Sequence, residues 1–150
     1  MAATVTTAMC TSFKENLLKG KHNFDNGDTF KIALISADSS ATGTYDATTT
    51  SYTQLQGNGE VSGGGYSAGG QALDSPTVTT SGTTAFVDFA NETFSTVTVS
   101  AIGCLIYNDS DSGKLAVATF SFGGTVSSTA GDFTIQFPTA NATNAIIRIA

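Results

Sequence analysis

Strand-like segments separated by turn residues recur along almost the whole chain, and this recurrence constrains the fold more than any other feature. The segments are alternating or continuously apolar, and they return at intervals of roughly 10–15 residues. Only residues 12–19 show the spacing of an amphipathic helix. The pattern therefore predicts an all-β protein: an antiparallel β-sandwich, immunoglobulin-like or jelly-roll-like, with one short N-terminal helix.

The length of 150 residues is typical of one domain, and no linker-like segment divides the chain. We expect residues 12–150 to form a single β-sandwich domain. Residues 1–11 carry no charged residue. This segment is either an N-terminal arm, able to add as a strand to a neighbour's sheet, or the first strand of the sandwich. The sequence leaves both interpretations open.

The helix predicted over residues 12–19 has local signals at both ends. Ser12 and Glu15 have the spacing of a capping box, while Phe13 and Leu17 lie one turn apart on the same face. Gly20 follows and can end the helix in the left-handed conformation. A helix of about two turns is not stable alone, so its apolar face is expected to pack against the sheets.

The most apolar strand patterns identify the side chains expected to be buried. These predicted core residues are Phe30, Ile32, Leu34, Val99, Ile102, Leu105, Phe120, Phe133, Ile135 and Phe137. Residues 77–89, "TVTTSGTTAFVDF", indicate a hairpin with its turn at Ser81 and Gly82.

The charge pattern disfavours several classes of partner. Only 12% of the residues are charged, and the net charge is −6. Residues 1–35 hold four lysines against three acidic residues, whereas residues 36–150 hold two basic residues against nine acidic ones. A nucleic-acid-binding protein needs a basic face, so we expect no nucleic acid partner. The longest apolar run is far shorter than the roughly 20 residues of a membrane-spanning helix, so no membrane partner is expected either.

The stretch "EVSGGGYSAGGQAL", residues 60–73, raises the question of phosphate binding. Gly65 and Gly70 have the spacing of a phosphate-binding loop, but Gln71 and Ala72 stand where that loop needs lysine and a hydroxyl residue. No helix pattern follows to present its N-terminus to an anion. The glycines are better explained by bends or by close approach of the backbone to a neighbouring strand.

Residues with catalytic or metal-binding chemistry are few and scattered. Asp109 and Asp111 have calcium-like spacing, but "NDSDSG" lacks the later acidic ligands and indicates a hairpin turn. His22 is the only histidine and, after a helix end, is expected to be solvated or near the helix dipole. Cys10 and Cys104 are expected to be buried or idle thiols rather than a disulfide framework. We therefore predict no catalytic, cofactor-binding or metal-binding residues, no cofactor and no enzymatic activity.

The four tyrosines, Tyr45, Tyr52, Tyr66 and Tyr107, are dispersed along the chain. They suit packing in the core or at its rim better than stacking on sugars. The chain also lacks the basic start and long apolar stretch of a signal peptide, which favours synthesis and assembly in a cytoplasm.

An ordered series of segments resembles small structural proteins of tailed, cyanophage-like bacteriophages, almost from end to end. The segments are "SFKENLLKGKHNF", "GDTFKIALIS", "EVSGGGYSAGGQAL", "SGTTAFVDFANETFSTVTVSAIGCLIYN", "KLAVATFSFGG" and "GDFTIQFPTANATNAIIRIA". The resemblance implies a virion component without enzymatic activity, located in the virion after assembly in the host cytoplasm. It transfers no catalytic residues and no place in the particle.

The sequence leaves three functional interpretations. The first is a capsid decoration (cement) protein that binds between capsomers, with the major capsid protein or other virion proteins as partners, and that forms a homo-oligomer. The second is a tail, collar or fibre component, and the third is a carbohydrate-binding module that uses the tyrosines and acidic loops. For the first, the expected contact surface is the N-terminal segment and helix, represented by Val5, Met9, Lys14, Lys19 and Lys21.

Overall fold

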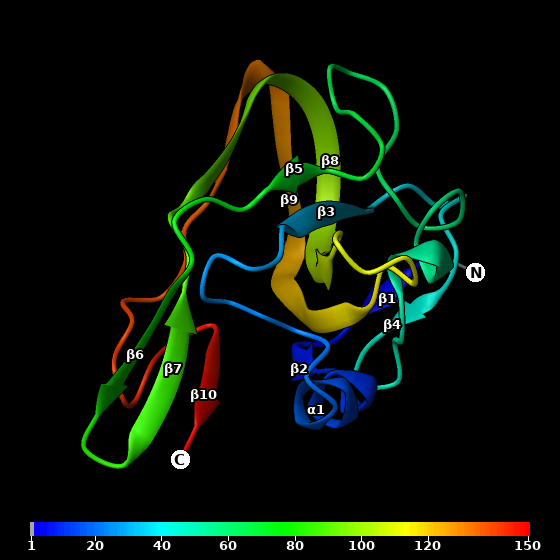
Figure 1. Cartoon of the computed structure of the whole chain (residues 1–150). Helices are drawn as coiled ribbons and strands as arrows, with labels where there is room; N and C mark the ends of the chain where they lie inside the picture. Colours follow the sequence, from blue (N-terminus) through cyan, green and yellow to red (C-terminus); the bar gives the residue numbers. More distant parts are fainter. Residues whose placement is uncertain (1) are drawn as a thin grey trace.

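Two antiparallel sheets and an eight-residue helix beside them make up most of the structure, a computed structural model that describes residues 2–150 (Figure 1). The elements in chain order are β1 (Thr4–Val5), β2 (Ala8–Met9), α1 (Thr11–Leu18), β3 (Phe30–Ser36), β4 (Thr44–Tyr45), the 3₁₀ turn η1 (Tyr52–Gln54), β5 (Gln71–Ala72), β6 (Thr77–Ser81), β7 (Thr84–Asp88), β8 (Glu92–Asn108), β9 (Ala116–Ile135) and β10 (Ile147–Ile149). The predicted all-β, sandwich-like class with a short N-terminal helix is confirmed.

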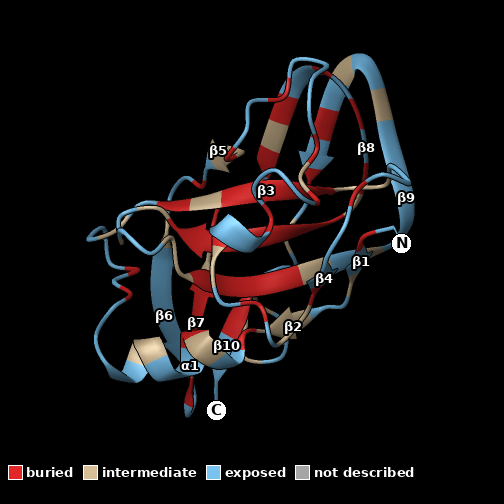
Figure 2. Ribbon diagram, turned by 90° about the vertical axis from the view of Figure 1, so that its right-hand side faces the viewer, coloured by how far each residue is buried: buried red, intermediate tan, exposed pale blue. Residues whose placement is uncertain are grey.

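The larger sheet has the strand order β2-β9-β8-β3-β5, with every neighbouring pair antiparallel. Strand β3, next to the central strand β8, is almost wholly buried, because both of its faces are covered; Ile32, Ala33, Leu34 and Ile35 are each 0% exposed. The continuous apolar run of β3, "FKIALIS", is the pattern expected for a strand buried on both sides. Figure 2 shows this buried centre in red.

The hairpin of β8 and β9 is much longer than the sheet to which it belongs. Beyond their pairing with the rest of the sheet, the two strands continue as a two-stranded ribbon that bends over the top of the molecule (Figure 1). The pairing register shifts near Thr96, and both Thr96 and Ala130 adopt positive φ angles, of 55° and 47°. Such irregularities bend a ribbon and increase its twist.

The smaller sheet has the order β10-β7-β6. Its hairpin is the one predicted, but the turn lies one residue later than expected: Ser81 pairs with Thr84, so Gly82 and Thr83 form the two-residue loop. Gly82 has a φ of 59°, as the first central residue of a type II′ turn requires. The prediction of Ser81-Gly82 as the turn is therefore wrong by one position.

The N-terminal segment, within its described residues, lies against the body of the protein. Strand β1 pairs with β4 in parallel, and β2 pairs with β9 at the edge of the larger sheet. The Thr119 hydroxyl also donates to the carbonyl of Thr6 at 2.7 Å. The described residues of this segment thus form two short strands that pair with the rest of the chain.

Helix α1 matches the predicted residues 12–19 to within one residue, but its predicted capping box does not form. Cys10 occupies the N-cap position, and the Ser12 hydroxyl donates instead to the carbonyl of Thr49 at 3.3 Å. Gly20 has a φ of 69° after the helix end, as expected. Phe13 is fully buried, and Leu17 is half-buried against the core.

Seven of the ten predicted core residues are buried. The other three, Ile102, Phe120 and Phe137, are only half-buried and pack against the edge of the core. Alternation identifies which side chains share a face of a strand, but a face is buried only where a second layer covers it. Ile102 and Phe120 lie on strands of the larger sheet, and Phe137 follows the end of β9.

Candidate functional site

The most elaborate polar cluster surrounds Glu60, which begins the glycine-rich stretch. Glu60 Oε2 accepts a hydrogen bond from the Tyr52 hydroxyl at 2.7 Å. Glu60 Oε1 accepts one from the Tyr66 hydroxyl at 2.8 Å and another from the backbone N–H of Gly69 at 2.7 Å. Both carboxylate oxygens are therefore engaged by donors of the chain itself.

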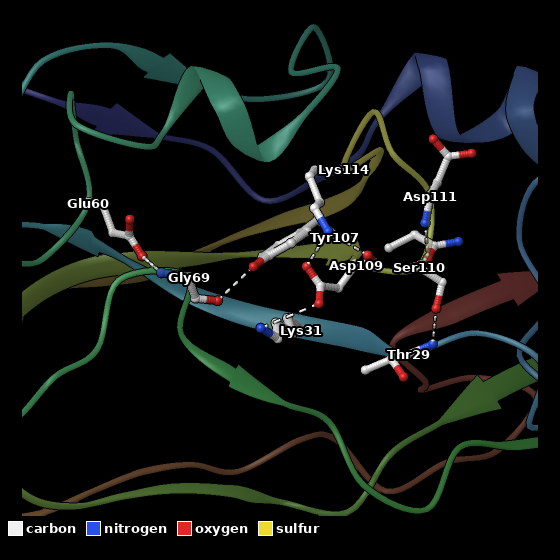
Figure 3. Close-up of polar contacts among 10 residues, drawn as sticks. Thr29, Lys31, Glu60, Gly69, Tyr107, Asp109, Ser110, Asp111 and Lys114 are labelled. Atoms are coloured by element: carbon white, nitrogen blue, oxygen red, sulfur yellow. Dashed lines mark hydrogen bonds and ion pairs between the residues drawn. The ribbon is translucent and has the colours of Figure 1, made fainter.

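Tyr107 extends this cluster into the larger sheet (Figure 3). Its hydroxyl donates to the carbonyl of Gly69 at 2.7 Å, and its ring stacks on that of Tyr52 with centroids 4.6 Å apart. Burial raises the pKa of Tyr52, Tyr66 and Tyr107 well above the ordinary value, so these hydroxyls stay protonated and act as donors.

The cluster holds the glycine-rich loop on the sheet. A Cβ atom at Gly70 would overlap with the carbonyl oxygen of Ile32, and one at Gly64 would overlap with that of Thr98. Both glycines also have positive φ angles. The prediction that these glycines serve close backbone approach is confirmed. We call the cluster of Tyr52, Glu60, Tyr66, Gly69 and Tyr107 the Glu60 clamp, because its carboxylate and phenol groups form hydrogen bonds within the chain.

The "NDSDSG" segment forms the turn between β8 and β9, as predicted. Asp109 Oδ1 lies 2.9 Å from Lys114 Nζ, and Asp109 Oδ2 lies 3.4 Å from Lys31 Nζ (Figure 3). The hydrogen bond from Lys114 holds the pKa of Asp109 below its usual value. Asp111 instead accepts from the N–H of Gly113 at 2.8 Å. The two carboxylates are thus used for turn chemistry and ion pairing.

Nowhere in residues 2–150 do three or more histidine, cysteine, aspartate or glutamate side chains gather as a metal site would require. In the same residues, no helix has the length and apolarity needed to cross a bilayer.

His22 is buried, so of the two expectations, solvated or near the helix dipole, the first is wrong. It is 7% exposed and packs against the rings of Phe13, Phe24 and Phe30. Its Nδ1 atom lies 3.3 Å from the amide nitrogen of Asn108, and its Nε2 atom has no hydrogen-bond partner within residues 2–150. Burial lowers the pKa of His22, although the nearby carboxylates of Asp28 and Asp111 oppose the shift.

Both cysteines are free, buried thiols, as expected. Burial raises the pKa of each to about 12, and Asp46 adds to the effect at Cys10. A thiol with so high a pKa is a poor nucleophile at neutral pH.

Two surface grooves are large enough to receive a ligand or a partner side chain. A polar groove of about 660 Å³ is lined largely by hydroxyl and amide residues from the loops after β3 and η1 and from β8. An apolar groove of about 480 Å³ lies between α1 and the smaller sheet, with Leu17, Val78, Val87 and Ile149 among its lining residues. Leu18, on the same helix, is 91% exposed.

The five residues predicted for the contact surface fall into two groups. Lys14, Lys19 and Lys21 are exposed on α1 or just after it, and Lys19 forms an ion pair with Glu15. Val5 and Met9 are half-buried against the core. The lysines are therefore available to a partner, whereas the two apolar residues anchor the N-terminal segment to its own fold.

Sequence reasoning missed the Glu60 clamp, because Tyr52, Glu60 and Tyr66 follow no recognised motif spacing, and Tyr107 lies 38 residues after Gly69. It also missed the burial of His22, whose neighbours in the sequence are polar. No protein-family model, curated protein or solved structure matches this chain.

Proposed function

We propose that the protein is a non-enzymatic structural component of a bacteriophage particle, and that it acts as a capsid decoration protein that binds between capsomers. The observation that carries this proposal is how the polar chemistry is used: the Glu60 carboxylate, the tyrosine hydroxyls and Asp109 are all engaged in bonds that hold the fold. A protein whose carboxylate and hydroxyl groups form internal bonds that hold its fold suits a mechanical role.

The distribution of charge and the sequence resemblance also support this role. The exposed lysines of α1 stand apart from an otherwise acidic chain. They can orient the helix end toward an acidic capsid surface, while the acidic remainder faces outward and keeps particles apart. Repeated over a lattice, even modest contacts give strong attachment through avidity.

A tail, collar or fibre component is the alternative within the same class. The alternative from another class, a carbohydrate-binding module, loses its main basis, because all four tyrosines are at most 8% exposed and their rings are covered. The hydroxyl-lined groove of about 660 Å³ is the remaining feature that favours a sugar ligand, and a glycan array tests it directly.

The copy number in purified particles tests the proposal. Quantitative mass spectrometry should find this chain in hundreds of copies per particle, and a map of the particle should place it on the outside of the head. A few to tens of copies, or density in the tail, would support the alternative. Absence from the particles would overturn the proposed function altogether.

Attachment can then be measured with purified protein and particles that lack it. Replacing Lys14, Lys19 and Lys21 together by alanine should weaken binding and its dependence on salt. Arg148→Ala is a control for the loss of an exposed positive charge elsewhere, because Arg148 lies on β10. Equal binding by the two variants would show that the helix end does not face the particle.

A further inference from the structure

Strand β6 forms an open edge of the smaller sheet. It pairs with β7 on one side, and within residues 2–150 no other strand pairs with its outer side. Ser81 and Thr84 close a two-residue hairpin loop, so they form a hydrogen-bonded pair, and hydrogen-bonded and non-bonded pairs alternate from there. The backbone N–H and C=O groups of Val78 and Thr80 therefore point outward from the sheet.

This edge lacks the features that normally prevent strand pairing between molecules. Every residue of β6 is exposed, and residues 75–87 carry no charged side chain in a protein with a net charge of −6. Edge strands of monomeric proteins are usually protected by lysine, proline, bulges or a very short length. Pro76 precedes β6 but does not interrupt it.

The other edges of the two antiparallel sheets are protected in this way. Strand β10, at the opposite edge of the smaller sheet, is only three residues long and carries the charged Arg148. The outermost strands of the larger sheet, β2 and β5, are only two residues long. The outer edge of the β9 ribbon is irregular, because Gly123 and Ala130 have positive φ angles of 77° and 47°. Among the edge strands of the two antiparallel sheets in the described chain, β6 thus stands out because it is regular, fully exposed and free of charged side chains.

We propose that two copies of this chain pair along β6, antiparallel about a two-fold axis that passes between the two Thr79 residues. In this register Val78 lies opposite the partner's Thr80, and Thr80 lies opposite the partner's Val78. Each opposed pair exchanges two hydrogen bonds, so all four outward groups of each strand are satisfied. Centring the axis on Val78 instead would place Thr80 opposite the partner's Pro76, which has no N–H to donate.

The two-fold register also suits the side chains. The two Thr79 side chains meet directly across the axis, and threonine pairs are favourable cross-strand neighbours. On the opposite face, Val78 is 50% exposed and lines the apolar groove, so pairing brings the grooves of the two copies beside each other. The result is a six-stranded sheet that runs through both molecules.

The seam is short, so the isolated dimer should be weak and should dissociate on dilution, because stable interfaces bury about 1,200–2,000 Å². Many copies held on one surface would make the same contact much more effective. The inference does not depend on the virion role, since the pairing is a property of the purified protein.

The test uses opposite charges at the two-fold axis. Wild-type protein should show a dimer fraction that rises with concentration in analytical ultracentrifugation. Thr79→Lys and Thr79→Glu should each weaken dimerisation at least about tenfold, because like charges directly opposite each other repel. An equimolar mixture of the two variants should restore the dimer. Thr129→Lys and Thr129→Glu are the matched controls, because Thr129 is also an exposed threonine but lies on the β9 ribbon.

Three outcomes would overturn the proposal. The wild-type protein could be monomeric at every soluble concentration, or the dimer could form equally well in the Thr79 variants. Alternatively, dimerisation could be lost in the single Thr129 variants and restored in their mixture. The last outcome would assign the contact to the β9 ribbon. None of these outcomes alters the copy-number test of the virion role, so the two proposals fail separately.

Discussion

The hydroxyl group of Tyr66 donates to Glu60 Oε1 at 2.8 Å while it accepts the backbone N–H of Leu34 at 3.0 Å. One side chain thus links the glycine-rich loop to the most buried strand of the protein. Neither β8 nor β5 provides a partner for Leu34 N–H, because β5 pairs only with Lys31 and Ile32 and β8 lies on the other side of β3. The phenol therefore completes the hydrogen bonding of β3 at Leu34.

Tyr66→Phe should lower the free energy of unfolding by about 1–3 kcal/mol, because it leaves the buried N–H of Leu34 without an acceptor. Tyr52→Phe is the matched control: it removes one bond to the half-exposed Glu60, where water can take its place. Urea denaturation of both variants measures the difference. Equal losses would mean that the bond to Leu34 contributes nothing specific.

Gly70→Ala should be far more harmful than Gly57→Ala, although the two glycines have nearly the same φ angles of 69° and 72°. At Gly57 the added methyl group meets no atom of the described chain within 4 Å, so only the left-handed conformation costs about 1–2 kcal/mol. At Gly70 the methyl group collides with the backbone of Ile32. We expect at least about 3 kcal/mol of additional destabilisation by chemical denaturation. Similar values for both variants would contradict the close approach.

The burial of His22 predicts a loss of stability in mild acid. Burial lowers its pKa in the folded state below the ordinary value of 6.5, so the unfolded chain binds the proton more readily. Stability should therefore fall as the pH decreases from about 7 through the window just below 6.5. Thermal midpoints measured at several pH values for the wild type and for His22→Gln check this.

The comparison with His22→Gln separates the contribution of His22 to the pH dependence of stability from that of the carboxylates. Burial raises the pKa of Glu92, an effect of opposite sign on stability that both proteins share. The variant should lose part of the pH dependence of the wild type. The same pH dependence in both proteins would show that His22 titrates as it does in the unfolded chain.

Removing residues 2–9 should destabilise the protein rather than leave a folded domain with an unchanged thermal midpoint. The deletion eliminates β1 and β2 and leaves the edge of β9 and the hydroxyl of Thr119 without their partners. Differential scanning calorimetry should show a lower midpoint than for the full chain. An unchanged midpoint would mean that the segment adds little to the fold and would revive the interpretation as an attachment arm.

The fold class and the helix could be predicted because their signals are local. Strand periodicity, turn residues and the spacing of Phe13 and Leu17 depend on neighbours in the sequence. The helix cap was predicted wrongly because the Ser12 hydroxyl found a tertiary partner in Thr49. Likewise, Phe120 is apolar at an alternating position, but no layer fully covers its face.

The polar sites could not be predicted, because the folded chain brings together side chains whose spacing matches no motif. Glu60 receives donors from Tyr52 and Tyr66, and the cluster reaches Tyr107 through the backbone of Gly69. His22 is buried by the nearby Phe24 and by Phe13 of α1 and Phe30 of β3, and only the fold brings the last two around it. In each case the local sequence is polar or glycine-rich and favours an exposed turn.

The pairing of β2 with β9 has a consequence for synthesis on the ribosome. Thr6 bonds to Thr119, which lies 113 residues later in the chain, so β2 must wait for its partner strand long after β1 can pair with β4. The hairpin of β8 and β9 can close early through its short turn, whereas the β2 contact requires closure of a very long loop. We expect β2 to dock among the later steps of folding, with Met9 exposed until β9 is in place.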